Sequence, residues 1–270
     1  MNLSNKNPKK FNPPKYGEFI QFGGTNYQIG EVINNGFFGI VHECVDEWGN
    51  ELVAKVILPK KRSYKSVRDT WLKELSNLSK LRHPNITYVH AAFEYQDTFY
   101  LFLERCEFSL NIIIQMKGLV PDLWIPYLAR DILNGLHFIH QNNVVHKDLH
   151  AGNILISGIS DLMTPNTSEV YRFKIADLGI ANLETKISPE HTLLANWMHP
   201  PEFIDRKFGD LGKQIDIYHF GLILLYLEYG KILKFTEDEI INGAPRRLAE
   251  SLKAKFSGPI ARALRRHTEQ

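Results

Sequence analysis

The chain of 270 residues has little cysteine, little net charge and no long hydrophobic run. Its two cysteines, Cys44 and Cys106, lie in unrelated segments, which argues against a disulfide framework and predicts a reducing, cytoplasmic setting. The 32 basic and 30 acidic residues leave a net charge of +2, too small to indicate a nucleic acid partner. No signal-peptide pattern or internal repeat is present, and residues 214–227, the most apolar stretch, are too short for a transmembrane segment and fit a buried core helix.

Two strand-like runs near the N-terminus flank a glycine-containing turn. The runs are Tyr27–Ile33 and Ile40–Cys44, and Gly36 and Gly39 lie around the turn. Glycine at such a turn lets the backbone approach phosphate oxygens without a Cβ in the way. Two glycines three residues apart also occur in ordinary β-turns, so the pattern by itself is weak.

A third strand, Leu52–Leu58, carries Lys55 among apolar residues. A buried lysine without a counter-charge is costly, so Lys55 either lies at a sheet edge or has an acidic partner. Glu74 is a candidate partner because it lies at the edge of the apolar face of the next predicted helix. The residues of that face are Val67, Trp71, Leu75, Leu78 and Leu81.

The most informative stretch is Val144–Leu155, followed later by Asp177. It contains His146, Asp148 and Asn153. Phosphoryl transfer needs a carboxylate to orient the attacking hydroxyl, and an amide and a second carboxylate to hold Mg²⁺ on the nucleotide phosphates. Asp148, Asn153 and Asp177 supply these three groups in that order along the chain.

With these parts in order, the sequence resembles a eukaryotic-type protein kinase, whose signature includes His-Arg-Asp-Leu, a downstream Asn and Asp-Phe-Gly. Lys147 replaces the Arg of that pattern, Leu178 replaces the Phe, and Asn34 replaces the first glycine of the phosphate loop. The resemblance implies an α+β, bilobal protein kinase fold. We expect a flexible lead-in over 1–25, a small antiparallel β-sheet lobe with one regulatory helix over 26–104, and a larger, mainly helical lobe over 105–270.

The resemblance also implies ATP and Mg²⁺ as cofactors. Asp148 would be the catalytic carboxylate, while Asn153 and Asp177 would be the metal ligands. Lys55, paired with Glu74, would hold the α- and β-phosphates. The further residues that the resemblance places around the nucleotide are Ile33, Asn34, Gly36, Gly39, Val41, Ala54, Leu103, Glu104, Cys106 and Leu155.

Residues 177–202 resemble an activation segment, because Pro200-Pro201-Glu202 takes the place of the family's Ala-Pro-Glu. We expect autophosphorylation within this segment, with Lys147 helping to hold the phosphate. The candidate hydroxyls are those of Thr185, Ser188 and Thr192. By resemblance, Asp216 supports the catalytic-loop backbone, and the long connection from Ser157 to Tyr171 reads as a surface insertion.

In the family, the glutamate at the position of Glu202 pairs with an arginine that would follow the last residues of this chain. We therefore expect either a kinase domain trimmed at its C-terminal end or a substitute partner for Glu202. The candidate substitutes are Arg262, Arg265 and Arg266.

Three functions fit the sequence. The first is an ATP- and Mg²⁺-dependent kinase acting on serine and threonine of protein substrates, because the tyrosine-kinase pattern after Asp148 is absent. His150, where Ser/Thr kinases usually carry a lysine, fits neither group. The second is a pseudokinase scaffold with little transfer. The third is a small-molecule phosphotransferase on a kinase-like fold, which the Pro-Pro-Glu ending of the activation segment disfavours.

Overall fold

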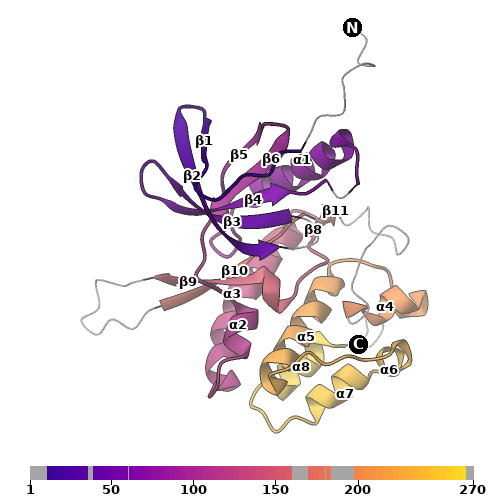
Figure 1. The fold of residues 1–270 in the computed structure, drawn as a ribbon. Coiled ribbons are helices and arrows are strands. Elements are labelled where there is room, and N and C mark those ends of the chain that lie inside the picture. The colour runs from indigo at the N-terminus through magenta and orange to yellow at the C-terminus, as the bar shows by residue number, and fades with distance from the viewer. Residues whose placement is uncertain are drawn as a thin grey trace. The chain divides into compact units, whose positions relative to one another are not determined.

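The computed structural model describes residues 11–35, 39–59, 61–159, 170–179, 181–183 and 198–265. The chain divides into two compact units: unit 1 comprises residues 1–82 and 87–105, and unit 2 comprises residues 83–86 and 106–270. Unit 1 is built around an antiparallel sheet, and unit 2 is mainly helical (Figure 1). The predicted α+β class is therefore confirmed.

Unit 1 contains a six-stranded antiparallel sheet in the order β1-β2-β3-β4-β6-β5. Its elements are β1 (Phe19–Phe22), β2 (Thr25–Asn35), β3 (Gly39–Asp46), β4 (Glu51–Ile57), α1 (Tyr64–Lys80), β5 (Val89–Tyr95) and β6 (Thr98–Glu104). Aromatic rings form much of the core: Phe93 stacks on Phe22 at 4.0 Å between ring centroids and on Phe102 at 5.0 Å.

Helix α1 confirms the helix predicted from apolar spacing. Its first turn is capped by the Ser63 side chain, which accepts a hydrogen bond from the Ser66 backbone at 3.2 Å. The Trp71 indole packs toward the sheet and donates to the Tyr100 carbonyl at 3.0 Å. Because this bond is buried, it fixes the rotation of α1 about its axis and so determines which side chains face β4 and β6.

The predicted lead-in is longer than the structure supports. Residues Phe19–Phe22 form β1 and pair with Thr25–Gln28 of β2. Ile20 is completely buried, so this hairpin belongs to the sheet and not to a flexible segment. A run of four residues with a single polar member, Gln21, carries too little pattern to predict a strand.

Unit 2 consists of helices with two small sheets, β10-β9-β7 and β11-β8. Its elements are β7 (Phe108–Ser109), α2 (Leu110–Ile114), α3 (Pro121–Gln141), β8 (Val144–Val145), η1 (Ala151–Asn153), β9 (Ile154–Ile159), β10 (Val170–Ile175), β11 (Asn182–Leu183), α4 (Pro201–Ile204), η5 (Arg206–Phe208), α5 (Gln214–Tyr229), α6 (Glu237–Ile241), α7 (Ala244–Glu250) and α8 (Ser257–Ala263).

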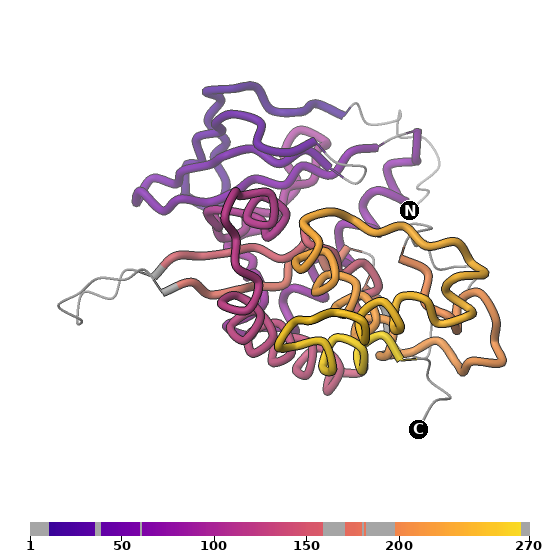
Figure 2. Tube along the Cα trace, turned by 90° about the horizontal axis from the view of Figure 1, so that it is seen from below, coloured from indigo at the N-terminus to yellow at the C-terminus, as the bar shows by residue number. Residues whose placement is uncertain are grey.

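β9 and β10 run antiparallel side by side (Figure 2). Of the predicted insertion 157–171, residues 157–159, 170 and 171 are therefore strand, and 160–169 lie outside the described residues.

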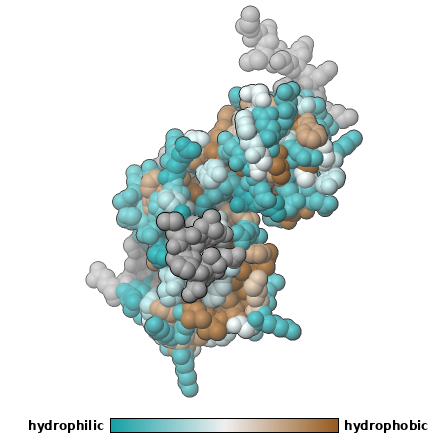
Figure 3. All heavy atoms as spheres, turned by 90° about the vertical axis from the view of Figure 1, so that its left-hand side faces the viewer, coloured by the Kyte–Doolittle hydropathy of each residue, from teal (hydrophilic) through white to brown (hydrophobic). Residues whose placement is uncertain are grey.

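Helix α5 forms the centre of unit 2, as its apolar sequence predicts. Nearly all of its side chains from Ile215 to Leu227 are buried, and the helix ends at Gly230, whose φ of 66° suits glycine. Within the described residues, no helix has the length and apolarity needed to cross a membrane. On the face shown in Figure 3, small hydrophobic patches lie among hydrophilic side chains.

A short turn before β5, residues 83–86, belongs to unit 2 although it lies within the range expected for the small lobe. The Asn85 side chain donates to the Phe173 carbonyl at 3.0 Å, and its carbonyl accepts from the Ile175 backbone at 2.8 Å. These two bonds tie the turn to β10, which explains its membership of unit 2.

Candidate active site

In unit 1, Lys55 of β4 and Glu74 of α1 form a buried ion pair. The Lys55 Nζ lies 2.7 Å from Glu74 Oε1, and the two side chains are only 8% and 3% exposed. A buried ion pair stabilises the fold only when its charges are hydrogen-bonded in good geometry. Lys55 Nζ donates to Glu74 Oε1 at a distance that is normal for a strong charged hydrogen bond. The structure thus brings together the two residues that the sequence predicted as partners, and it excludes the alternative of Lys55 lying at an open sheet edge.

The phosphate-loop candidates lie along β2 and β3 of unit 1. Asn34 pairs with Val41, and Val41 pairs with Lys55, so these three residues form a row across β2, β3 and β4. Asn34 was expected at the turn, but it is part of β2. A Cβ on Gly39 would lie 2.6 Å from the Val56 carbonyl oxygen, so close strand packing already requires glycine there. Gly36 lies outside the described residues.

In unit 2, Asp216 at the start of α5 holds the loop that carries Asp148. Its side chain is fully buried and accepts from the His146 backbone at 2.9 Å and the Lys147 backbone at 2.8 Å. The His140 ring donates to the same carboxylate at 2.7 Å. Burial by itself would raise the pKa of Asp216, but the hydrogen bonds, first that from His140, hold the pKa below its ordinary value.

His146 connects this loop to the segment that carries Asp177. The imidazole is completely buried; its Nδ1 accepts from the Asp148 backbone at 3.2 Å, and its Nε2 lies 3.0 Å from the Ala176 carbonyl oxygen. Since Nδ1 accepts a bond, Nε2 must carry the proton and donate to Ala176. A single side chain therefore fixes the backbone of Asp148 relative to the residue before Asp177.

The three predicted catalytic polar groups lie around this scaffold. The Asn153 amide donates to the Asp148 carbonyl at 2.9 Å, which orients its Oδ1 as an acceptor. The Asn153 carbonyl accepts from the Ala176 backbone at 2.9 Å, so it is also tied to the segment leading to Asp177. Asp177 has a left-handed backbone with φ of 60°, and its carboxylate accepts from the Gly179 backbone at 3.2 Å. Strain of this kind persists where surrounding contacts hold it, and it is typical of functional loops.

His150 lies next to Asp148, with 4.0 Å between its Nε2 and the Asp148 Oδ2. Its Nδ1 accepts from the Gly152 backbone at 3.1 Å, so the neutral ring carries its proton on Nε2 and directs it toward the carboxylate. Burial lowers the pKa of His150, so the ring is neutral near pH 7. His150 therefore does not supply the positive charge that a lysine would supply at this position.

Comparison with known proteins decides the family. The protein kinase domain model matches residues 27–264, nearly the whole chain. The chain belongs to the protein kinase family.

Curated relatives support this assignment. The kinase is 27% identical to mouse cyclin-dependent kinase-like 5 over 89% of the chain and 25% of the relative. It is 27% identical to mitogen-activated protein kinase 8 of Arabidopsis thaliana over 86% of the chain and 40% of the relative. It is 32% identical to serine/threonine-protein kinase ATG1a of Arabidopsis thaliana over 76% of the chain and 32% of the relative. The chain thus spans from a quarter to two fifths of the length of these relatives.

The kinase carries its predicted residues in two groups. Unit 1 holds Lys55, Glu74 and the strand residues of the expected nucleotide site, and unit 2 holds Asp148, Asn153 and Asp177 together with Leu155 of β9. Glu104 and Cys106, which the resemblance places around the nucleotide, lie at the point in the chain where unit 1 ends at Arg105 and unit 2 resumes. Glu202 is buried in α4 and has an interaction partner within the chain. The choice between a trimmed domain and a substitute arginine stays a prediction. Thr185, Ser188, Thr192 and Arg266 lie outside the described residues.

Sequence reasoning missed the supporting histidines of the kinase. His146 was part of the quoted motif but received no role, and His140 was not considered. A signal was available for His140, because it lies near the end of the long helix that leads directly into the loop. His219 of α5 was also missed, since a histidine inside an apolar helix has no distinctive spacing.

We expect His219 to make the stability of the kinase depend on pH. Its Nε2 donates to the Met198 carbonyl at 2.9 Å, and burial lowers its pKa to about 4. The unfolded chain, with an ordinary pKa of about 6.5, binds the proton first as the pH falls, so stability is complete above that value and declines toward pH 4. The expected loss is about 3 kcal/mol, at about 1.4 kcal/mol for each unit of pKa.

Denaturant unfolding of the wild type and His219→Gln across this range measures the effect. Glutamine keeps a donor toward the Met198 carbonyl but cannot titrate. The difference in unfolding free energy between the two proteins should change steadily as the pH falls from about 6.5 to 4. A difference that is independent of pH would show that His219 does not titrate with folding.

Proposed function

We propose that this protein kinase uses ATP and Mg²⁺ to phosphorylate serine and threonine hydroxyls of proteins. The observation that carries the proposal is the bonded arrangement of Asp148, Asn153 and the segment before Asp177 in unit 2. A carboxylate held for a hydroxyl next to an amide and a second carboxylate is the set that phosphoryl transfer requires.

Each residue has a proposed role. Asp148, whose side chain is 26% exposed, orients the substrate hydroxyl. Lys55, held by Glu74, contacts the α- and β-phosphates. Backbone groups at Glu104 and Cys106 bind adenine. The side chains proposed to contact the nucleotide are Ile33, Val41, Ala54, Leu103 and Leu155, with the backbone around Asn34, Gly36 and Gly39 near the phosphates.

The donor set fits Mg²⁺. Among the described residues, no group of three or more His, Cys, Asp and Glu could hold a metal ion without help. Mg²⁺ is commonly held by one or two protein ligands together with substrate phosphates, and Asn153 and Asp177 supply one amide oxygen and one carboxylate. When bound with ATP, the ion neutralises charge on the phosphates.

Replacing Asp177 with asparagine should weaken binding of Mg²⁺-ATP at least about tenfold while leaving binding of metal-free ATP nearly unchanged, because only a metal ligand is altered. Asp210→Asn is a matched control, since that side chain is fully exposed in the same unit. Calorimetric titration with ATP, with and without Mg²⁺, measures both. Equal weakening in the two titrations would mean that Asp177 does not act through the metal.

Preference for serine and threonine is supported by the relatives, because ATG1a is named as a serine/threonine-protein kinase. We also propose autophosphorylation within residues 177–202 at Thr185, Ser188 or Thr192. Mass spectrometry before and after incubation with ATP tests it, and an absence of phosphate between residues 180 and 200 in active protein would contradict it.

Incubation with γ-labelled ATP and Mg²⁺ in the presence of either a generic protein or a panel of small hydroxyl compounds tests the proposal against its alternatives. We expect label on protein. Label on small compounds alone would indicate a small-molecule phosphotransferase, and nucleotide binding without any transfer would indicate a pseudokinase.

We propose a cytoplasmic location for the kinase. Both cysteines are free thiols: Cys44 is buried and Cys106 is partly exposed. Unpaired cysteines are the normal state in a reducing compartment. Localisation of a fluorescently tagged full-length protein tests this, and a secreted or membrane-associated signal would contradict it.

A further inference from the structure

The two carboxylate oxygens of Asp148 have different surroundings. The side-chain amide of Asn153 donates to Oδ2 at 3.5 Å, and His150 Nε2 lies 4.0 Å from the same oxygen. Among the described residues, none bonds to Oδ1. Two donors therefore face Oδ2, and Oδ1 is left to accept a hydrogen bond from a substrate hydroxyl.

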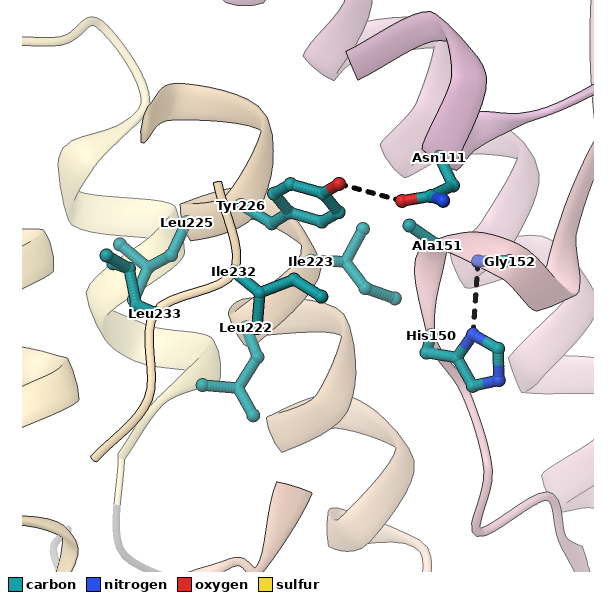
Figure 4. Close-up of a pocket in the computed structure, with 10 residues that line it drawn as sticks. All are labelled: Asn111, His150, Ala151, Gly152, Leu222, Ile223, Leu225, Tyr226, Ile232 and Leu233. Atoms are coloured by element: carbon teal, nitrogen blue, oxygen red, sulfur yellow. Dashed lines mark hydrogen bonds between the residues drawn. The ribbon is translucent and has the colours of Figure 1, made fainter. Parts of the chain in front are cut away.

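The turn that follows His150 holds its ring in one orientation. His150 Nδ1 accepts from the Gly152 backbone at 3.1 Å and so caps η1 (Figure 4). A Cβ on Gly152 would lie 2.9 Å from His150 Cε1 and 3.0 Å from Nδ1, so a larger residue there would displace the ring. The ring also lies at the wall of a pocket that Asn111 and Tyr226 line (Figure 4).

This fixed ring presents a donor to the Asp148 carboxylate. Because Nδ1 accepts a hydrogen bond, the proton of the neutral ring is on Nε2, the atom nearest Oδ2. The 4.0 Å between the two atoms is about 1 Å longer than a normal hydrogen bond, and bonds of catalytic groups commonly tighten when the substrate binds. The Asp148 side chain is 26% exposed, so it has room to turn toward the ring.

We propose that His150 is a positioning residue for Asp148: its Nε2–H bonds to Oδ2 and thereby turns Oδ1 toward the substrate hydroxyl. The inference rests on the proposed kinase function and adds a residue to it. The role needs a hydrogen-bond donor and no positive charge, because the acceptor is itself charged and strengthens the bond.

Two substitutions separate the roles of the two ring nitrogens. Asparagine at position 150 keeps an acceptor close to the place of Nδ1, so it still caps η1, but its amide is too short to reach Asp148. Glutamine carries its amide nitrogen close to the place of Nε2 and so keeps the donor. We expect His150→Asn to lower kcat about tenfold and His150→Gln to keep at least about a third of the wild-type kcat.

Steady-state kinetics with a threonine peptide measures these values, together with a thermal melt and calorimetric titration of Mg²⁺-ATP. We expect both variants to melt and to bind the nucleotide as the wild type does. A wild-type kcat in His150→Asn, or equal losses in the asparagine and glutamine variants, would overturn the proposal. His137→Asn is the matched control, because it makes the same substitution at an exposed position of the same unit, and it should leave kcat unchanged.

A double-mutant cycle tests whether His150 acts through Asp148. In the Asp148→Asn background, adding His150→Asn should lower the remaining rate by less than about twofold, because the carboxylate that the ring positions is already gone. A further tenfold loss would mean that the ring acts on another group, such as the transferred phosphoryl, and would overturn the positioning role.

Gly152→Ala is a second route to the same result if His150→Asn perturbs folding. The added methyl group displaces the ring, so kcat should fall in the wild-type background and change little in the His150→Asn background, which has no ring to displace. Equal losses in both backgrounds would overturn the proposal. A wild type that transfers no phosphate to protein overturns the kinase function, whereas an active wild type that His150→Asn matches overturns the positioning role alone.

Discussion

Asp148→Asn should lower the rate of phosphoryl transfer by about 10² to 10⁴-fold while leaving Mg²⁺-ATP affinity within about twofold of the wild type. Asparagine keeps the size of the side chain and the backbone bond to His146, but it cannot accept the proton of a substrate hydroxyl. The effect should therefore fall on kcat. Steady-state kinetics with a threonine peptide, together with calorimetric titration of ATP, measures the two quantities.

Asp210→Asn serves as the control for Asp148→Asn, because it removes one carboxylate of the same unit from a fully exposed position. We expect its kinetics to match those of the wild type. Wild-type transfer by Asp148→Asn would show that this carboxylate has no catalytic role, and loss of ATP binding in the same variant would show that its role is structural.

Asp216→Ala should destabilise unit 2 by about 3–5 kcal/mol, because it leaves buried donors without an acceptor. The donors are the backbone groups of His146 and Lys147 and the ring of His140. For a chain of this size, the melting temperature should fall by roughly 10 °C. Activity should fall as well, since the loop that carries Asp148 loses its anchor.

Differential scanning calorimetry measures the destabilisation, with two comparison variants. Asp216→Asn keeps one oxygen acceptor and should lie between the wild type and Asp216→Ala. Asp210→Ala removes an exposed carboxylate and should melt with the wild type. If Asp216→Ala melted within about 2 °C of the wild type, the anchoring role of the carboxylate would be wrong.

The parts of the site that the sequence predicted are those carried by short-range motifs or strong periodicity. Asp148, Asn153 and Asp177 follow one another in a recognisable order, and the apolar period of α1 places Glu74 toward the sheet that holds Lys55. Such signals require only the spacing of residue types along one element. The resemblance to protein kinases then supplied the roles.

The parts that the sequence did not predict depend on contacts between distant segments. His140 and Asp216 are 76 residues apart, and neither type of side chain signals by itself that it will be buried against the other. The strand β1 was missed because four residues carry too little pattern, and its burial follows from pairing with β2. The pocket beside His150 was not foreseen because its walls come from α2, α5 and η1.

Phosphoamino-acid analysis is the most direct test of the central claim that this chain phosphorylates serine and threonine of proteins. The chain is incubated with radiolabelled ATP, Mg²⁺ and a generic protein substrate, with Asp148→Asn and a reaction lacking Mg²⁺ as blanks. We expect labelled phosphoserine or phosphothreonine in the wild-type reaction and in neither blank. Label confined to phosphotyrosine, or no label on protein in a reaction where the folded wild type binds ATP, would contradict it.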